Sequence, residues 1–290
     1  MARALNEVNI NGRVVIGEEG RLGEYRLLDT GSNVGTGRGP KVDVALDPID
    51  GTRSVARGRP GAISVASIAP RGSMWSPRPA VYMDKIVVDR EVGSYLVPEC
   101  LDAPVGWTLA LIARAKEKEV RDLRVIVLDR PRHEALVNDI RYAGAKVMLR
   151  PDGDTAGALL AAQPNTRADI LIGIGGVPEG VTAACAVKAL GGAMLGRLAP
   201  QSDEERKAVE EAGLDTERIL TDDELVSSRQ IYFAATGITH GLLLDNVDYR
   251  GNQAQTHSMV VRGETGTLRN IRTEYHGLDS LLIDLTHTDE

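Results

Sequence analysis

The 290-residue sequence contains few aromatic residues, few cysteines and no long apolar run. Aromatic residues make up 3% of the chain, with a single Phe, so its core must be built from Val, Ile, Leu and Ala, a composition that suits sheets covered by helices. The two cysteines, Cys100 and Cys185, indicate no disulfide framework and no cysteine-based metal site, and they favour a reducing compartment. Since no apolar run approaches the roughly 18 residues of a membrane span and the first residues do not resemble a signal peptide, we expect a soluble, cytoplasmic protein.

The sequence also has no block of like charge, and its net charge is −7. Both features make nucleic acid an unfavourable partner, because nucleic-acid binding relies on clustered basic residues. An anionic substrate stays compatible with this acidity, because the charge of the site matters more than the total charge. We expect no membrane partner and a homo-oligomer.

The pattern of apolar residues changes near residue 98. The first part is rich in predicted strands, whereas strands and helices alternate from residue 109 onward, which favours a mainly parallel sheet with helices on its faces. We therefore predict an α/β protein with an α+β N-terminal part, divided into a metal-binding subdomain (1–97) and a substrate-binding subdomain (98–290). Strands are predicted at 13–16, 42–46, 62–69, 82–88, 123–128, 146–149, 170–174, 231–235, 256–262 and 268–274, and helices at 1–8, 109–118, 131–143, 155–162, 181–190 and 202–212.

The motif Asp-Pro-Ile-Asp-Gly-Thr at 47–52 follows one of these strands. Its two carboxylates repel one another unless a proton or a cation lies between them, and hard divalent ions prefer oxygen ligands. This predicts a metal site at a strand end. Because Asp-Pro and Asp-Gly are also ordinary turn sequences, the motif alone does not decide between a metal site and a turn.

The polar loops after the three predicted strands of the second part are a further indication, because ligands bind at the carboxyl ends of strands in such sheets. Arg130 and Arg132 are suited to phosphate, since the guanidinium fork matches phosphate oxygens, although they could equally be two surface arginines. Glu179 could reach a metal or could only complement a helix dipole. The nearby glycines at 173–176 are a weak match to a dinucleotide-binding turn, and a phosphate held by backbone N–H groups there is the better interpretation.

The histidines and serines favour no other chemistry. His133 is more easily interpreted as a helix-start residue than as a catalytic base, and the remaining histidines have no metal-ligand spacing. No serine has the partners of an acyl-transfer triad. Carboxylates at strand ends, an arginine pair and a threonine hydroxyl are instead the parts used in metal-dependent hydrolysis of phosphate esters.

These motifs resemble the lithium-sensitive phosphatase superfamily, which includes inositol monophosphatases and fructose-1,6-bisphosphatases. The similarity is greatest to class II fructose-1,6-bisphosphatases of the bacterial GlpX type, and it extends over roughly residues 5–276. The stretches that carry it occur in one order, at 16–19, 47–52, 82–85, 129–133, 151–154, 173–180, 196–198 and 234–239.

The resemblance implies a layered αβαβα sugar-phosphatase fold and hydrolysis of the 1-phosphate of fructose 1,6-bisphosphate with Mg²⁺ or Mn²⁺, as in gluconeogenesis. Sedoheptulose 1,7-bisphosphate is a second implied substrate. Thr52 would orient the attacking water, and Asp47 and Asp50 would act with it in catalysis. The implied metal ligands are Glu18, Asp47, Asp50 and Glu179, and the implied substrate-binding residues are Asp50, Gly51, Thr52, Tyr82, Arg130, Pro131, Arg132, Asp152, Gly153, Asp154 and Gly176.

The sequence departs from the family pattern in two places. The family has an additional N-terminal helical segment with an Asp ligand, ahead of the point where this chain starts, and the loop after Glu18 is slightly longer here, so that Glu19 is an alternative ligand. These departures leave two other hypotheses open. One is a non-catalytic sugar-phosphate-binding protein, and the other is a phosphatase for another substrate, such as an inositol phosphate.

Overall fold

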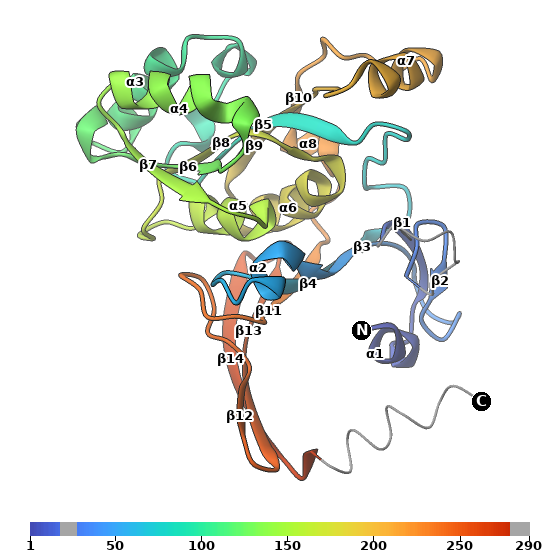
Figure 1. Cartoon of the computed structure of the whole chain (residues 1–290). Helices are drawn as coiled ribbons and strands as arrows, with labels where there is room; N and C mark the ends of the chain where they lie inside the picture. Colours follow the sequence, from blue (N-terminus) through green and yellow to red (C-terminus); the bar gives the residue numbers. More distant parts are fainter. Residues whose placement is uncertain (18–27, 279–290) are drawn as a thin grey trace.

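The computed structural model describes residues 1–17 and 28–278 of the chain, which form two sheets with helices between and outside them (Figure 1). Their strands are β1 (Asn11–Ile16), β2 (Asn33–Val34), β3 (Lys41–Asp50), β4 (Ile63–Pro70), β5 (Tyr82–Val88), β6 (Arg124–Leu128), β7 (Lys146–Arg150), β8 (Ile170–Gly176), β9 (Ala193–Leu198), β10 (Leu220–Thr221), β11 (Tyr232–Gly237), β12 (Asp248–Arg250), β13 (Gln253–Arg262) and β14 (Thr267–His276). The α-helices are α1 (Ala2–Glu7), α2 (Thr52–Ala56), α3 (Val105–Ala115), α4 (Glu134–Tyr142), α5 (Asp154–Ala162), α6 (Val177–Leu190), α7 (Asp203–Glu211) and α8 (Asp222–Leu225). Short 3-10 helices cover Gly93–Tyr95, Pro98–Leu101, Val120–Asp122 and Pro131–His133.

The eight-stranded sheet has the order β12-β13-β11-β4-β3-β1-β2, with β14 pairing with β13. The six-stranded sheet has the order β10-β9-β5-β8-β6-β7. Its strands β6, β7 and β8 are parallel, but β5 is antiparallel to both of its neighbours, β8 and β9. The parallel arrangement predicted for the strands at 123–128, 146–149 and 170–174 is confirmed. The sheet as a whole is mixed, because apolar patterning reports burial and not the direction in which strands such as β5 enter a sheet.

Helices α5 and α6 lie between the two sheets (Figure 1), and the largest apolar core joins them to both. A second core lies under α3 and α4 on the other face of the six-stranded sheet. On the outer face of the eight-stranded sheet, Leu5 of α1 packs with Val44 and Leu46 of β3, whereas Ala45 between them faces the central core. Such alternation follows from the two-residue period of a strand. The chain therefore has the predicted layered α/β fold, with layers in the order αβαβα.

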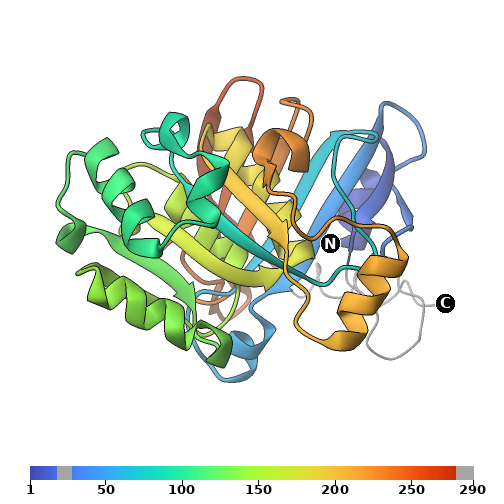
Figure 2. The ribbon, with the colours of Figure 1, turned by 90° about the horizontal axis from the view of Figure 1, so that it is seen from above.

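Neither sheet is built from one part of the sequence. Strand β5, expected in the first subdomain, pairs within the six-stranded sheet, and β11–β14, expected in the second, extend the eight-stranded sheet. The sheets therefore do not divide at residue 97. Seen from above, α4 (green) and α7 (orange) lie at opposite sides of the molecule (Figure 2). Among residues 1–17 and 28–278, no helix has the length and apolar character needed to cross a membrane.

Most predicted elements are confirmed, and their boundaries differ in informative ways. Strand β5 has the predicted bounds, and the turn at 263–266 joins β13 and β14 as an antiparallel hairpin. Strand β3 continues past the predicted end at residue 46 to Asp50. Strand β8 likewise continues to Gly176, so the glycines that were expected in a loop belong to a strand.

Candidate active site

A pocket of about 430 Å³, which we call the main pocket, lies where the two sheets meet. The eight-stranded sheet contributes β3 and the start of α2, and the six-stranded sheet contributes the residues that follow β6, β7 and β8. Tyr82 lies at the same edge, because β5 runs antiparallel and pairs Tyr82 with Gly176. The pocket brings together the predicted site residues Asp47, Asp50, Gly51, Thr52, Tyr82, Arg130, Arg132, Asp152, Gly153, Asp154, Gly176 and Glu179.

Two residues of the predicted set are absent from this lining. Pro131 lines a neighbouring pocket instead. Glu18 and its alternative Glu19 lie outside the described residues. Apart from Pro131, the part of the predicted set that the structure describes is thus gathered in one pocket.

The two aspartates of the 47–52 motif depend on a bulge in β3. Residues three apart in a regular strand point to opposite faces of the sheet. Here the register shifts, since Asp47 pairs with Val65 and Asp50 pairs with Ile63, so β3 contains one more residue than β4 over this stretch. One extra residue restores a common side for both carboxylates. Pro48 lies within the bulge, and its lack of an N–H is tolerated there.

The residues around the bulge hold these carboxylates in position. The backbone N–H of Ile49 donates to Asp47 Oδ1 at 2.8 Å. Gly51, which caps α2, has φ of 98°, a left-handed conformation that glycine adopts without steric cost. Thr52 then begins α2 with an exposed side chain that lines the pocket.

Asp50 is the most buried of the motif's carboxylates, with 3% of its surface exposed. Burial, followed by the charges of Asp154, Asp47 and Glu179, raises the pKa of Asp50 well above its ordinary value. Burial and the charge of Asp154 likewise raise the pKa of Glu179 to about 7. Mutual repulsion of buried carboxylates is relieved by a proton or by a cation.

Lys85 is a residue of this site that sequence reasoning missed. Its side chain is 1% exposed, and its Nζ lies 2.5 Å from Asp154 Oδ2. A lysine buried this deeply requires a partner, because an isolated buried charge is very unfavourable. The signal in the sequence was the alternation within β5, which puts Lys85 on the same face of the strand as the apolar residues Met83 and Val87.

The space for these groups is provided by glycines at the end of β8. A Cβ on Gly175 would overlap Asp154 Oδ2 and Lys85 Nζ, and a Cβ on Gly176 would overlap Glu179 Oε2. The backbone just beyond is poorly suited to hold a phosphate, because the Val177 N–H donates to the Val81 carbonyl and Pro178 has no N–H. The glycines therefore make room for carboxylates, which replaces the expected phosphate-binding turn.

The two arginines that flank Pro131 point to different partners. Arg130 donates to Asp152 Oδ1 at 2.9 Å, and the backbone N–H of Arg53 donates to Asp152 Oδ2 at 3.0 Å. Arg132 donates through Nη2 to the Ile174 carbonyl at 2.8 Å, and its guanidinium lies 5.1 Å from the centre of the Tyr82 ring. Arg132 is thus a cation inside the main pocket, whereas Arg130 ties the loop after β6 to Asp152 in the loop after β7, which the Arg53 N–H in turn ties to α2.

Arg150 connects the same loop to the other sheet. Its Nε donates to the Gly153 carbonyl at 3.1 Å, and its Nη2 donates to the Gly61 carbonyl, just before β4, at 3.1 Å. The guanidinium also lies close enough to Asp50 to favour its charged form. This arginine therefore fixes how the 152–154 loop approaches the carboxylates of β3.

His133 has a structural role, in agreement with the interpretation from the sequence. It is 3% exposed, and its Nε2 accepts from the backbone N–H of Ile174 at 2.9 Å. Its Nδ1 lies 2.7 Å from the Leu128 carbonyl and must donate to it. The acceptor role of Nε2 requires the neutral ring, and burial lowers the pKa of His133. It links the ends of β6 and β8.

The carboxylates fit a divalent cation by their chemistry. They are hard oxygen donors, and Asp50 and Glu179 carry raised pKa values that a cation would reverse. Within residues 1–17 and 28–278, however, no three His, Cys, Asp or Glu side chains form a ready-made metal centre. The ligand set therefore requires adjustment of these side chains or the participation of Glu18 or Glu19.

Buried carboxylates facing an arginine, within a layered α/β fold, are typical of a hydrolase that acts on phosphate esters. Residues 1–275 match the family model described as bacterial fructose-1,6-bisphosphatase, glpX-encoded, so the chain belongs to that family. It is 39% identical to fructose-1,6-bisphosphatase class 2 of Haemophilus influenzae, over 97% of this chain and 86% of that protein. It is 37% identical to fructose-1,6-bisphosphatase 1 class 2 of Escherichia coli K12, over 95% of this chain and 84% of that protein.

Proposed function

We propose that this chain is a metal-dependent phosphatase that releases the 1-phosphate of fructose 1,6-bisphosphate. The observation that carries the proposal is the convergence of two sets of side chains on one pocket of about 430 Å³. Carboxylates from β3 and α6 meet Tyr82, Arg132 and the Asp-Gly-Asp loop of the other sheet there. The names of the two relatives and the length of the match support the same activity.

In this proposal Asp47, Asp50 and Glu179, together with Glu18, hold Mg²⁺ or Mn²⁺. The divalent ion supplies charge neutralisation for the phosphoryl group and lowers the pKa of a water molecule. The charges of Asp154, Asp47 and Glu179 raise the pKa of Asp50, and the four carboxylates together create the negative potential that attracts such an ion. Asp50 also accepts a long hydrogen bond from the backbone N–H of Ala156, at 3.4 Å, which limits its rotation.

The remaining residues act on the water and on the sugar bisphosphate. The Thr52 hydroxyl accepts a hydrogen bond from the attacking water and orients it toward phosphorus. Arg132 donates to phosphate oxygens, and its stacking over Tyr82 keeps the guanidinium in the pocket. Asp152 and Asp154 are acceptors for the sugar hydroxyls, and Gly51, Gly153 and Gly176 leave room for the sugar.

Several finer predictions belong to the same proposal. Sedoheptulose 1,7-bisphosphate is a second substrate, because it carries the same phosphate ester at position 1 on a longer sugar. A cytoplasmic location agrees with two cysteines that are both free and buried. The homo-oligomeric state remains a prediction.

The test is phosphate release from fructose 1,6-bisphosphate by the purified chain with Mg²⁺, with Mn²⁺ and with a chelator. We expect release that requires metal, with inositol 1-phosphate turned over at least about a hundredfold more slowly because it lacks the second phosphate. Binding of the bisphosphate without any release at saturating Mn²⁺ would contradict the proposal and favour a non-catalytic binding protein.

A further inference from the structure

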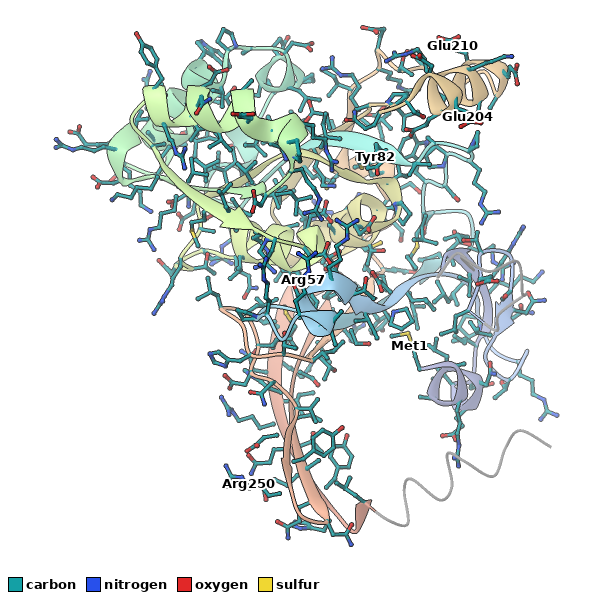
Figure 3. The ribbon with its side chains drawn as sticks, in the orientation of Figure 1. Met1, Arg57, Tyr82, Glu204, Glu210 and Arg250 are labelled. Atoms are coloured by element: carbon teal, nitrogen blue, oxygen red, sulfur yellow. The ribbon has the colours of Figure 1, made fainter. Side chains whose placement is uncertain are left out.

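A second pocket adjoins the main one and is lined largely by arginine. It has a volume of about 230 Å³, and Arg53 and Arg130 line both pockets. Arg57 and Arg59 complete the basic part of its lining, and Figure 3 shows Arg57 beside α2, well separated from Tyr82 of the main pocket. We call this the arginine pocket. Its remaining lining consists of Ser54, Asp129, Pro131 and Pro151.

The local structure brings Arg53, Arg57 and Arg59 close together. Arg53 and Arg57 are four residues apart at α2, a spacing that puts two side chains on the same face of a helix. The turn after α2 then folds back, because the backbone N–H of Arg59 donates to the Ser54 carbonyl at 2.7 Å. Like charges at this spacing repel, so the arrangement favours a ligand that neutralises them.

The protein itself does little to neutralise this charge. In the part of the chain that the structure describes, the side chains of Arg53, Arg57 and Arg59 form no ion pair, and Asp129 is the carboxylate among the lining residues. Arg130 is already paired with Asp152, so the other three guanidinium groups face Asp129 as the carboxylate of the lining, in a chain whose net charge is −7. Such a local reversal of sign, in a concave place, attracts anions.

We propose that the arginine pocket is a second phosphate-binding site, separate from the place where the ester is hydrolysed. Guanidinium groups from two directions, α2 and the loop after β6, can bind the oxygens of a tetrahedral phosphate in pairs. The ligand has two possible sources with the same chemistry. It is a separate phosphate-bearing anion, or it is the far phosphate of a sugar bisphosphate whose near phosphate occupies the main pocket.

A ligand here would also be linked to the main pocket. Arg130 holds Asp152 Oδ1, and the backbone N–H of Arg53 holds Asp152 Oδ2. A phosphate that draws Arg130 toward itself competes with Asp152 for this guanidinium. Occupation of the arginine pocket therefore changes how the 152–154 loop is held, and through it the affinity for sugar in the main pocket.

The decisive experiment measures binding of inorganic phosphate to the full chain by calorimetry, with a chelator present so that no metal recruits phosphate to the carboxylates. The variant Arg57→Gln/Arg59→Gln is compared with Arg114→Gln/Arg141→Gln, which removes the same charge from exposed positions on α3 and α4. We expect the dissociation constant to rise at least about tenfold in the first variant and less than about twofold in the second. Equal phosphate binding by the wild type and the first variant would overturn the proposal.

Kinetics then distinguish the two sources of phosphate. If the far phosphate of the substrate binds here, Arg57→Gln/Arg59→Gln raises KM for the bisphosphate and leaves kcat nearly unchanged. If a separate anion binds here, KM is unchanged and the effect of added phosphate on turnover is lost. The calorimetric measurement needs no turnover, so it stands even if the chain proves not to be a phosphatase.

Discussion

The main pocket and the arginine pocket share Arg53 and Arg130, yet they hold charge in opposite ways. In the main pocket, acidic groups from both sheets are buried close together, and Lys85 and Arg150 compensate them from inside the protein. In the arginine pocket, Arg53, Arg57 and Arg59 are exposed, and water and salt screen their charges. Burial therefore makes the carboxylate charges of the main pocket unfavourable, whereas solvation makes the charges of the arginine pocket cost little free energy.

This comparison predicts which charged residues affect both function and stability and which affect function alone. A buried carboxylate that repels its neighbours reduces stability, and it is retained because it acts on a ligand. An exposed arginine contributes little to stability whether or not it acts. Substitutions in the main pocket and in the arginine pocket should thus have very different effects on the free energy of unfolding.

The largest expected effect is on catalysis. Asp50→Asn should lower turnover of fructose 1,6-bisphosphate by about 10³-fold, because it removes a negative ligand from the centre of the carboxylate group. The free energy of unfolding should stay the same or rise, since the raised pKa of Asp50 means that its charge is disfavoured in the folded protein. Phosphate release and urea unfolding measure the two quantities. The control is Asp139→Asn, at an exposed position on α4. Near-normal turnover by Asp50→Asn would show that Asp50 has no role in catalysis.

The next effect concerns stability. Lys85→Met should lower the free energy of unfolding by about 3 kcal/mol or more, because it leaves Asp154 buried without its partner. Adding Asp154→Asn should recover part of the loss. Urea unfolding of both variants measures this, with Lys146→Met as the control for an exposed pair, in which Lys146 lies 3.3 Å from Asp122. A loss for Lys146→Met as large as that for Lys85→Met would contradict the difference drawn between buried and exposed charge.

A smaller effect should appear with pH in the metal-free protein. The pKa of Glu179 is raised from 4.5 to about 7, so between these values the folded state binds more protons than the unfolded state. Stability from this group is therefore fully present below pH 4.5 and is lost as the pH rises through 7, by at most about 3 kcal/mol.

Urea unfolding at several pH values, with a chelator present, measures this dependence. Carboxylates in ion pairs give the opposite trend, so the informative quantity is the difference between the wild type and Glu179→Gln. We expect Glu179→Gln to gain stability relative to the wild type as the pH rises from 4.5 to 7. A constant difference over that range would mean that Glu179 is ionised throughout.

The smallest expected effect lies in the arginine pocket. Arg57→Gln/Arg59→Gln should change the free energy of unfolding by less than about 0.5 kcal/mol, because both side chains are exposed. Any change should be stabilising at low salt, where repulsion between the guanidinium groups is strongest. Thermal unfolding at low and high salt tests this. Strong destabilisation would reveal a structural role and would weaken the case for a ligand.

Much of the site could be predicted from the order of residues. The loops after β6, β7 and β8 were expected to be functional because polar residues follow apolar strands, and their residues line the main pocket. Two features could not be predicted in this way. In the sequence, Lys85 looks like an ordinary polar residue of a strand. Its role follows from its buried ion pair with Asp154, which lies 69 positions later in the chain. The divergence of Arg130 and Arg132 depends on side-chain partners that local sequence does not specify.

The sequence alone determined the α/β class, most helices and strands, and the residue types of the site, because apolar periodicity and turn residues act over short distances. Tertiary structure decided the rest. Strand β5 lies antiparallel to its neighbours in the six-stranded sheet. A bulge in β3 brings Asp47 and Asp50 to one side of that strand. Both features depend on pairing between distant strands, and the register of a strand is specified by the partner it meets and not by its own residues alone.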